Sequence, residues 1–123
     1  MKKRILISIH PEHVKNILSG LKKYEYRKVT AKQETSSMLI YETSPTMKVV
    51  AEVKIEAVLT YPPEELWDLT HADSCISKEF FDNYFKERSL AHAYKLGKIK
   101  IFDEPKKLCE YGIKTAPQSF VYL

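Results

Sequence analysis

A chain of 123 residues, of which 44% are hydrophobic and 29% charged, is long enough to bury an apolar core without disulfide or metal staples. This composition excludes an intrinsically disordered chain, and no window approaches the ~20 apolar residues of a membrane-spanning helix. We therefore expect one soluble, cytoplasmic domain over residues 1–123 that does not act at a membrane.

The net charge of +4 is unevenly distributed along the chain. Residues 1–33 carry nine Lys or Arg against Glu12 and Glu25, residues 51–87 have a net charge of −6, and residues 88–123 have a net charge of +4. If the two basic ends meet in the fold, they form one positive surface that suits a polyanion. An ordinary mixed surface is the other interpretation.

Cysteine, histidine and glycine form no recognisable cofactor or metal motif. Cys75 and Cys109 are far apart and neither belongs to a C-x-x-C pair, so both are expected to be free thiols. His10 and His13 lack the i, i+4 spacing of a zinc-binding helix. Only three glycines occur, which excludes a Gly-rich phosphate loop. We expect no metal and no cofactor.

The first elements are a strand, a helix and a second strand. Residues 4–9 alternate in the manner of a strand. Residues 11–20 predict a helix, because Pro suits its first position and Gly can end it in the left-handed conformation. Residues 23–28 predict a strand on which Glu25 and Arg27 share one face.

The rest of the chain supplies more strands and two more helices. Residues 49–61 are the clearest strand, because apolar and polar side chains alternate strictly along them. The other expected elements are a strand over 38–42, a turn over 43–46, helices from Pro63 and from a Ser77 cap, a strand over 91–102, a short turn or helix over 106–111, and a closing strand after 117–119. This order predicts an α+β fold, a compact and partly closed mixed β-barrel with helices packed outside.

Aromatic residues have two possible uses in such a fold. Tyr24, Tyr26 and Tyr41 could stack on nucleic-acid bases, or they could serve as core and cross-strand packing. The helix predicted to begin at the Ser77 cap carries an aromatic stripe that is expected to pack in the hydrophobic core. The stripe consists of Phe80, Phe81, Tyr84 and Phe85.

Residues 20–27 fit the pattern G-x-K-x-x-E-x-R, with Lys22, Glu25 and Arg27 at its defined positions. This pattern is the signature of the ASCH family, a branch of the PUA-like superfamily, and the chain resembles that family over nearly its whole length. Three further segments match in the expected order: the first strand and helix start at 7–12, the Y-x-T-S-P turn at 41–45, and the P-Q-S-F segment at 117–120.

The resemblance implies a PUA-like barrel with a cleft beside the first helix. It also implies RNA or nucleotide binding, with members acting as RNA-linked regulators of transcription or translation. Some relatives cleave RNA, and others hydrolyse modified nucleosides as amidohydrolases. The amidohydrolase-like branch has a threonine at the position of Glu25, so a covalent mechanism would lack an evident nucleophile on this strand.

The three motif side chains have chemistry suited to a nucleotide. The Lys22 ammonium can extend over the cleft, and the Arg27 fork suits a phosphate or a carbonyl edge. The Glu25 carboxylate can accept from an exocyclic amino group. Because Glu25 and Arg27 are two apart on one strand, they can also form an ion pair, either to orient the arginine or only to hold the barrel together.

Five further polar residues complete the expected ligand site, and each has a structural alternative. Ser8 could donate a hydroxyl or simply leave room for a neighbouring strand. Thr43 and Ser44 could bind phosphate or serve the turn. Gln118 and Ser119 could contact a base edge or satisfy backbone groups where the barrel closes.

Three functions remain open at this point. The first is a binding module for RNA or a nucleotide. The second is a hydrolase acting on RNA or a modified nucleoside, in which Lys22 acts as a base or as an oxyanion stabiliser and Glu25 moves a proton or activates water. The third is a protein-interaction module whose polar cleft is purely structural.

Overall fold

Strands and helices follow one another along the chain nearly as the sequence predicts. The computed structural model describes residues 3–31 and 34–123. Within these ranges the elements are β1 (Lys3–Ile9), α1 (Pro11–Leu18), β2 (Tyr24–Arg27), β3 (Thr35–Glu42), β4 (Lys48–Tyr61), α2 (Pro63–Thr70), the 3-10 helix η1 (His71–Asp73), α3 (Lys78–Tyr84), β5 (Ala91–Lys106), the 3-10 helix η2 (Leu108–Tyr111) and β6 (Phe120–Tyr122).

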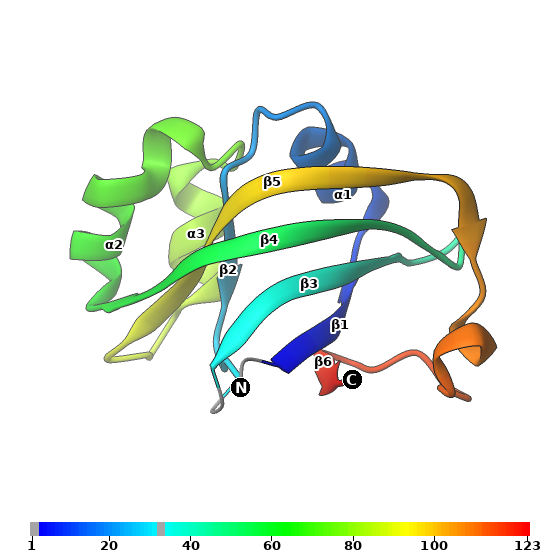
Figure 1. Cartoon of the computed structure of the whole chain (residues 1–123). Coiled ribbons are helices and arrows are strands. Elements are labelled where there is room, and N and C mark those ends of the chain that lie inside the picture. The colour runs from blue at the N-terminus through cyan, green and yellow to red at the C-terminus, as the bar shows by residue number, and fades with distance from the viewer. Residues whose placement is uncertain (1–2, 32–33) are drawn as a thin grey trace.

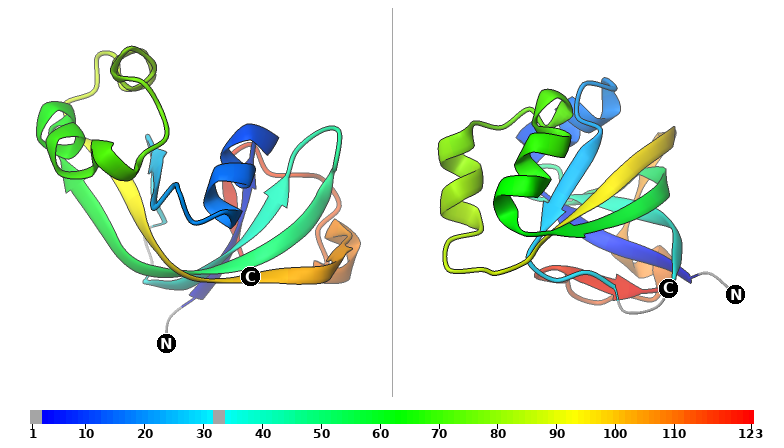
Figure 2. Two further views of the ribbon diagram at one scale, coloured as in Figure 1. Left: turned by 90° about the horizontal axis from the view of Figure 1, so that it is seen from above. Right: turned by 90° about the vertical axis from the view of Figure 1, so that its left-hand side faces the viewer.

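All strands of the described chain form one mixed sheet in the order β2-β5-β4-β3-β1-β6. β1 and β3 are parallel and the other neighbours are antiparallel. The sheet curls into an open half-barrel, with α1 lying within its curve and α2 and α3 grouped at one end (Figures 1 and 2). The α+β class and the partly closed barrel are therefore confirmed.

The two long strands β4 and β5 pair irregularly along the curved sheet. Their pairing shifts register at three places between Val49 and Ala57, and such irregularities bend and twist a strand. The predicted alternation holds where β4 crosses the core, because Ala51 and Val53 are buried while Lys54 between Val53 and Ile55 is exposed. β5 continues to Lys106, four residues beyond the predicted end.

α1 ends in a way that fixes the start of the motif. Gly20 adopts a φ of 83°, the left-handed conformation that glycine adopts without strain. The amides of Leu21 and Lys22 then both donate to the carbonyl of Asn16, at 3.1 and 2.9 Å. These bonds close the helix end and direct the chain into β2, so that Lys22 leaves the helix at a defined position.

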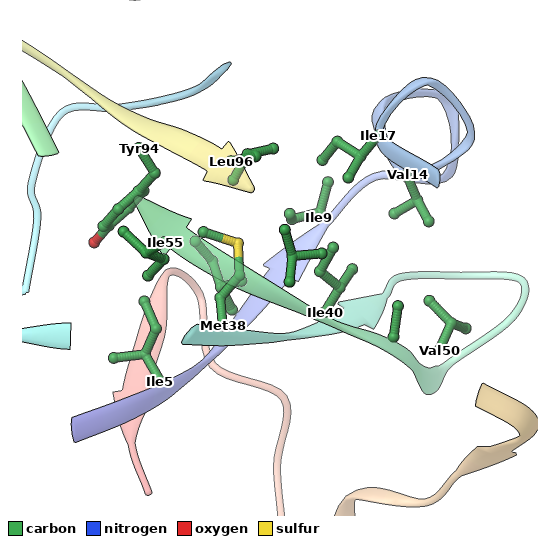
Figure 3. Packing of buried hydrophobic residues seen from close by; sticks show 13 residues of the cluster. Ile5, Ile9, Val14, Ile17, Met38, Ile40, Val50, Ile55, Tyr94 and Leu96 are labelled. Carbon is green, nitrogen blue, oxygen red and sulfur yellow. The ribbon is translucent and has the colours of Figure 1, made fainter. Parts of the chain in front are cut away.

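The main core fills the space between the sheet and α1 (Figure 3). Val14 and Ile17 of α1 pack there against apolar side chains of the central strands, including Ile5, Ile9, Met38, Ile40, Val53, Ile55 and Leu96. Tyr94 is fully buried in the same cluster, and its hydroxyl accepts a hydrogen bond from the Ala31 amide at 3.1 Å. This packing places α1 and β1 beside the motif.

A second cluster joins α3 to β2, and here one expectation is wrong. Phe81 and Phe85 are buried against Tyr26, but Phe80 is 47% exposed and Tyr84 is only partly buried. Residues 80 and 81 are adjacent, and neighbours on a helix point about 100° apart. The aromatic stripe therefore divides into a core flank and an outward flank.

The structure also bears on the cysteines, on metal-binding groups and on membrane-spanning helices. Cys75 and Cys109 both lie in the described ranges and are free, exposed thiols. Among the described residues, no group of His, Cys, Asp or Glu is arranged to hold a metal ion. No helix in the described part of the chain is long and apolar enough to cross a membrane.

Candidate functional site

A cleft of about 540 Å³ opens where five parts of the chain meet. They are residues 8–13 at the end of β1 and the start of α1, residues 22–27 with β2, Thr43 after β3, residues 76–84 with α3, and the segment 116–118. Six of the sequence-predicted site residues line it: Ser8, Lys22, Glu25, Arg27, Thr43 and Gln118. The structure thus brings the three motif side chains into one shared concavity, together with segments far away in the sequence.

Lys22 lies on the inner side of this cleft with only 3% of its surface exposed. Its ammonium donates to the carbonyl of Ser74 at 2.7 Å and lies 5.3 Å from the centre of the Tyr26 ring. Burial lowers the pKa of Lys22, and the neighbouring Glu25 carboxylate partly opposes this shift. The amine is therefore held in place and is easier to deprotonate than a surface lysine.

Glu25 and Arg27 form the predicted ion pair. Arg27 Nη2 and Nε both donate to Glu25 Oε2, at 2.8 and 3.2 Å, and Nη2 also donates to the Ser8 carbonyl at 2.9 Å. The side chains of Arg27 and Glu25 are only 13% and 8% exposed. Among the described residues, the second oxygen, Glu25 Oε1, has no hydrogen-bond partner. The pair thus orients the guanidinium and leaves an acceptor available to a ligand.

The other predicted polar residues lie at different depths. The Ser8 hydroxyl donates to the Pro117 carbonyl at 2.7 Å, which ties β1 to the segment 116–118. The Thr43 hydroxyl lies 3.4 Å from His10 Nδ1 at the rim. Gln118 is exposed on the lining. Ser44 and Ser119 lie next to lining residues but are not part of the lining, so contact of their hydroxyls with a ligand stays a prediction.

His13 is a lining residue that sequence reasoning did not assign to the site. Its side chain is 17% exposed, and its Nδ1 atom is buried with no hydrogen-bond partner among the described residues. Burial is the main reason that the pKa of His13 is lowered, and Lys22 adds to this while Glu25 opposes it. The sequence did contain a signal for this position. His13 lies four residues before Ile17, and this helical spacing places it beside the apolar stripe of α1.

The cleft also has aromatic side chains in its lining. Tyr26, Phe80 and Tyr84 all line it, together with Ile76. Tyr26 and Tyr41 are only 6% and 4% exposed. Both therefore serve as core packing, the alternative to base stacking that the sequence left open. Burial raises the pKa of both Tyr26 and Tyr84, which keeps their hydroxyls neutral. Phe80 was expected in the core and instead lies at the mouth of the cleft.

The charges in the cleft favour an anion. Lys22 and Arg27 contribute two cations to the described lining, whereas Glu25 contributes one carboxylate. The lowered pKa of His13 keeps its imidazole neutral near pH 7. A desolvated cation attracts an anion much more strongly than an exposed one does, because water screens it less. A phosphate or another acidic group is therefore the complementary ligand.

A family model for the ASCH domain matches residues 7–100. This chain belongs to the ASCH domain family. The ASCH protein of Zymomonas mobilis has a closely similar crystal structure, with a TM-score of 0.89, 27% sequence identity, and coverage of 98% of this chain and 87% of that one. A tyrosine-to-phenylalanine variant of that protein matches equally well, with a TM-score of 0.89 at 26% identity over 99% of this chain and 91% of the other. The expected ASCH and PUA-like fold is thus confirmed.

Curated relatives of this ASCH domain have diverse names. An "ASCH domain-containing ribonuclease" of Z. mobilis is 29% identical over 77% of this chain and 65% of its own length. The large ribosomal subunit protein uL22 of Ureaplasma parvum is 33% identical over 97% of this chain. The ATP synthase subunit alpha of the same species is 31% identical over 99% of it.

The relatives from Ureaplasma parvum are much longer than this ASCH domain. The chain spans about two fifths of the ribosomal protein, at 39%, and 15% of the ATP synthase subunit. One ASCH domain thus matches parts of two proteins whose names have nothing in common. The two names do not point to one shared function for the matched region.

Proposed function

We propose that this ASCH domain binds RNA and holds one nucleotide in the cleft around Lys22, Glu25 and Arg27. One observation carries the proposal: two nearly buried cations face the same cavity as a carboxylate that keeps one oxygen without a partner among the described residues. The cavity of about 540 Å³ falls in the range of small-molecule sites. The ribonuclease name of the Z. mobilis relative supports an RNA-related role.

Each side chain has a defined part in this proposal. The ammonium of Lys22 and the guanidinium of Arg27 face the phosphate, because charge-assisted hydrogen bonds to phosphate are the strong ones. Glu25 Oε1 accepts from an exocyclic amino group of the base. Gln118 and Thr43 add polar contacts from the rim, with Ser44 and Ser119 close enough to extend them. Regulation of transcription or translation would follow from such binding and is part of the proposal.

The test compares two adjacent lysines. Lys22→Met removes the buried cation but keeps an apolar stem of similar length, and Lys23→Met removes an exposed cation outside the cleft. Both variants lose the same formal charge. Loss of one charge-assisted hydrogen bond should weaken binding of a short single-stranded RNA by about 10- to 100-fold in Lys22→Met.

Fluorescence anisotropy at two salt concentrations measures this difference. Lys23→Met should change affinity only through the general salt-dependent attraction. Equal weakening by both substitutions would show that the RNA contacts the surface charge and not the cleft. No binding of single-stranded RNA to the unaltered protein at low salt would refute the proposal altogether.

RNA cleavage is the second candidate function, and the lowered pKa of Lys22 favours it. In that case Glu25 Oε1 takes the proton of the attacking hydroxyl, either of water or of the ribose. The attacking oxygen bonds to phosphorus as the P–O bond to the leaving ribose oxygen breaks, and that leaving oxygen takes a proton from the Lys22 ammonium. Lys22 stabilises the negative charge that develops on the phosphoryl oxygens. Two side chains that line the same cleft would thus supply both the proton transfer and the charge stabilisation.

Cleavage is tested with end-labelled RNA and the same pair of lysine variants. We expect Lys22→Met and Glu25→Gln to lower the cleavage rate at saturating RNA by about 100-fold or more, in line with losing a general acid–base or charge-stabilising group. Lys23→Met should cleave at the rate of the unaltered protein. RNA that binds but stays intact over long incubation would leave binding as the function.

A further inference from the structure

The α3 side of the cleft carries an aromatic surface that the proposed nucleotide site does not use. Phe80 is 47% exposed although it lies beside a well-packed cluster. Its ring is nearly parallel to that of Tyr84, with an angle of 8° and a centroid distance of 6.4 Å. His13 approaches Phe80 edge-on from α1, at a centroid distance of 6.0 Å. We call Phe80 and Tyr84 the aromatic pair.

Packing of α3 does not explain why Phe80 is exposed. The helix is anchored through its other flank, where Phe81 and Phe85 contact the Tyr26 ring of β2 at centroid distances of 5.0 and 6.0 Å. Adjacent aromatic side chains that line a cleft together with a few polar groups are typical of ligand-binding sites. The exposed part of Phe80, together with the partly exposed Tyr84 beside it, is the surface available for that contact.

Positive charge lies next to this surface. The ammonium of Lys28 lies 4.9 Å from the centre of the Tyr84 ring, and Lys28 is exposed. Arg27 lies in the cleft beside it. The negative charge of Asp82 on α3 is balanced by Lys78, whose ammonium lies 2.8 Å from the Asp82 carboxylate. Aromatic rings flanked by cations match a base attached to a phosphate, because the base stacks while the phosphate is neutralised.

We propose that the aromatic pair is a stacking surface for the base of a second nucleotide, adjacent to the one in the cleft. This inference rests on the proposed RNA-binding function and narrows its ligand to a single-stranded segment of at least two nucleotides. Bases inside a duplex are stacked on each other and cannot offer a free face to Phe80. A free mononucleotide would leave the aromatic pair empty.

The test compares a nucleoside 5′-monophosphate with a dinucleotide of the same base, by calorimetry or competition. The unaltered protein should bind the dinucleotide more tightly. In Phe80→Ala, the affinity for the dinucleotide should fall by about 5- to 20-fold, within the range measured for removing one base-stacking ring. Affinity for the mononucleotide should stay within about twofold, because the first nucleotide does not stack there.

Two further variants make the result specific. Leu90 is 48% exposed, nearly the same as Phe80, but lies outside the cleft, so Leu90→Ala should bind both ligands normally. Phe80→Trp should bind the dinucleotide at least as well as the unaltered protein. If Phe80→Ala fails to fold, Phe80→Leu keeps the apolar volume and removes only the ring.

The outcomes separate the inference from the function on which it rests. Equal dinucleotide affinity in Phe80→Ala and the unaltered protein overturns the stacking surface. Equal losses for both ligands also overturn it, since Phe80 would then act within the first nucleotide site. If the unaltered protein binds neither ligand nor longer single-stranded RNA, the proposed function itself fails, and the stacking surface fails with it.

Discussion

The two sides of the cleft differ in how their side chains are held in place. The polar wall consists of Ser8, Lys22, Glu25 and Arg27, and hydrogen bonds between 2.7 and 3.2 Å hold it together. The aromatic wall consists of Phe80 and Tyr84, whose rings contact each other without a hydrogen bond between them. The polar wall is fixed mainly by directional hydrogen bonds, and the aromatic wall is built mainly from contacts between rings.

This difference predicts separate roles for the two walls in ligand binding. Desolvated charges interact strongly but only with a partner of matching geometry, whereas an aromatic face accepts any base. The polar wall should therefore determine whether an anionic nucleotide binds at all, and the aromatic wall should determine how long a strand is preferred. Substitutions in the polar wall should also lower the free energy of unfolding more than substitutions in the aromatic wall do, because removing part of the polar wall leaves a buried charge unpaired.

The largest expected effect on stability comes from breaking the buried ion pair. Arg27→Ala leaves the Glu25 carboxylate unpaired, and loss of one partner of a buried pair typically costs about 3–5 kcal/mol. Removing both charges in Glu25→Ala/Arg27→Ala should be less destabilising than the sum of the two single substitutions. Urea denaturation measures the free energy of unfolding for each variant.

The exposed cluster of Lys78 with Glu64 and Asp82 is the control for this experiment. Water screens these charges, so Lys78→Ala should be far less destabilising than Arg27→Ala. Similar losses in the two variants would contradict the view that burial makes the polar wall special.

An intermediate effect is expected at Tyr26, where the two walls meet. Its ring packs on Phe81, and its hydroxyl lies 2.6 Å from the Thr70 hydroxyl. Tyr26→Phe should lower the free energy of unfolding by about 1 kcal/mol, the typical net value of one hydrogen bond. Thr70 keeps its bond to the Leu66 carbonyl, so no buried group is orphaned. A loss of several kcal/mol would show that the hydroxyl organises the cleft as well.

The smallest effect concerns pH and His13, at the corner between the walls. Burial lowers its pKa in the folded state, helped by Lys22 and His10 and opposed by Glu25 and Glu12. As pH falls below about 6.5, the unfolded chain takes up a proton on this histidine before the folded chain does, so stability is lost. His13→Gln should therefore lose less stability than the unaltered protein between pH 7.5 and pH 5.5.

The pH measurement needs a reference outside the cleft. Burial also lowers the pKa of His92, which does not line the cleft and contributes its own part of the acid loss. His92→Gln reports that part separately. If His13→Gln and the unaltered protein lose equal stability on acidification, His13 does not carry the buried, neutral imidazole described above.

Much of the polar wall could be predicted from the sequence because its determinants are local. Pro11 and Gly20 delimit α1, and the spacing within residues 20–27 places the three motif side chains after it. Glu25 and Arg27 pair because alternate residues of a strand share a face, as predicted. The alternation in residues 49–61 likewise predicted the central strand of the sheet.

The aromatic wall could not be predicted in the same way. Phe80 lies more than fifty residues beyond the motif, and only the tertiary packing of α3 on Tyr26 brings it to the cleft. Adjacent aromatic residues on a short helix cannot all face one core, and the sequence does not show which flank turns outward. His13 was missed for a related reason, since α1 presents it at the edge of its buried face.

The most direct test of the cleft as an RNA site is an NMR titration of the ¹⁵N-labelled protein with a short single-stranded RNA. We predict that the largest amide shift changes fall on cleft-lining residues and saturate together, among them Ser8, His13, Lys22, Glu25, Arg27, Thr43, Phe80, Tyr84 and Gln118. Shift changes concentrated on the β4–β5 face away from α1, or spread evenly over exposed lysines, would contradict the account.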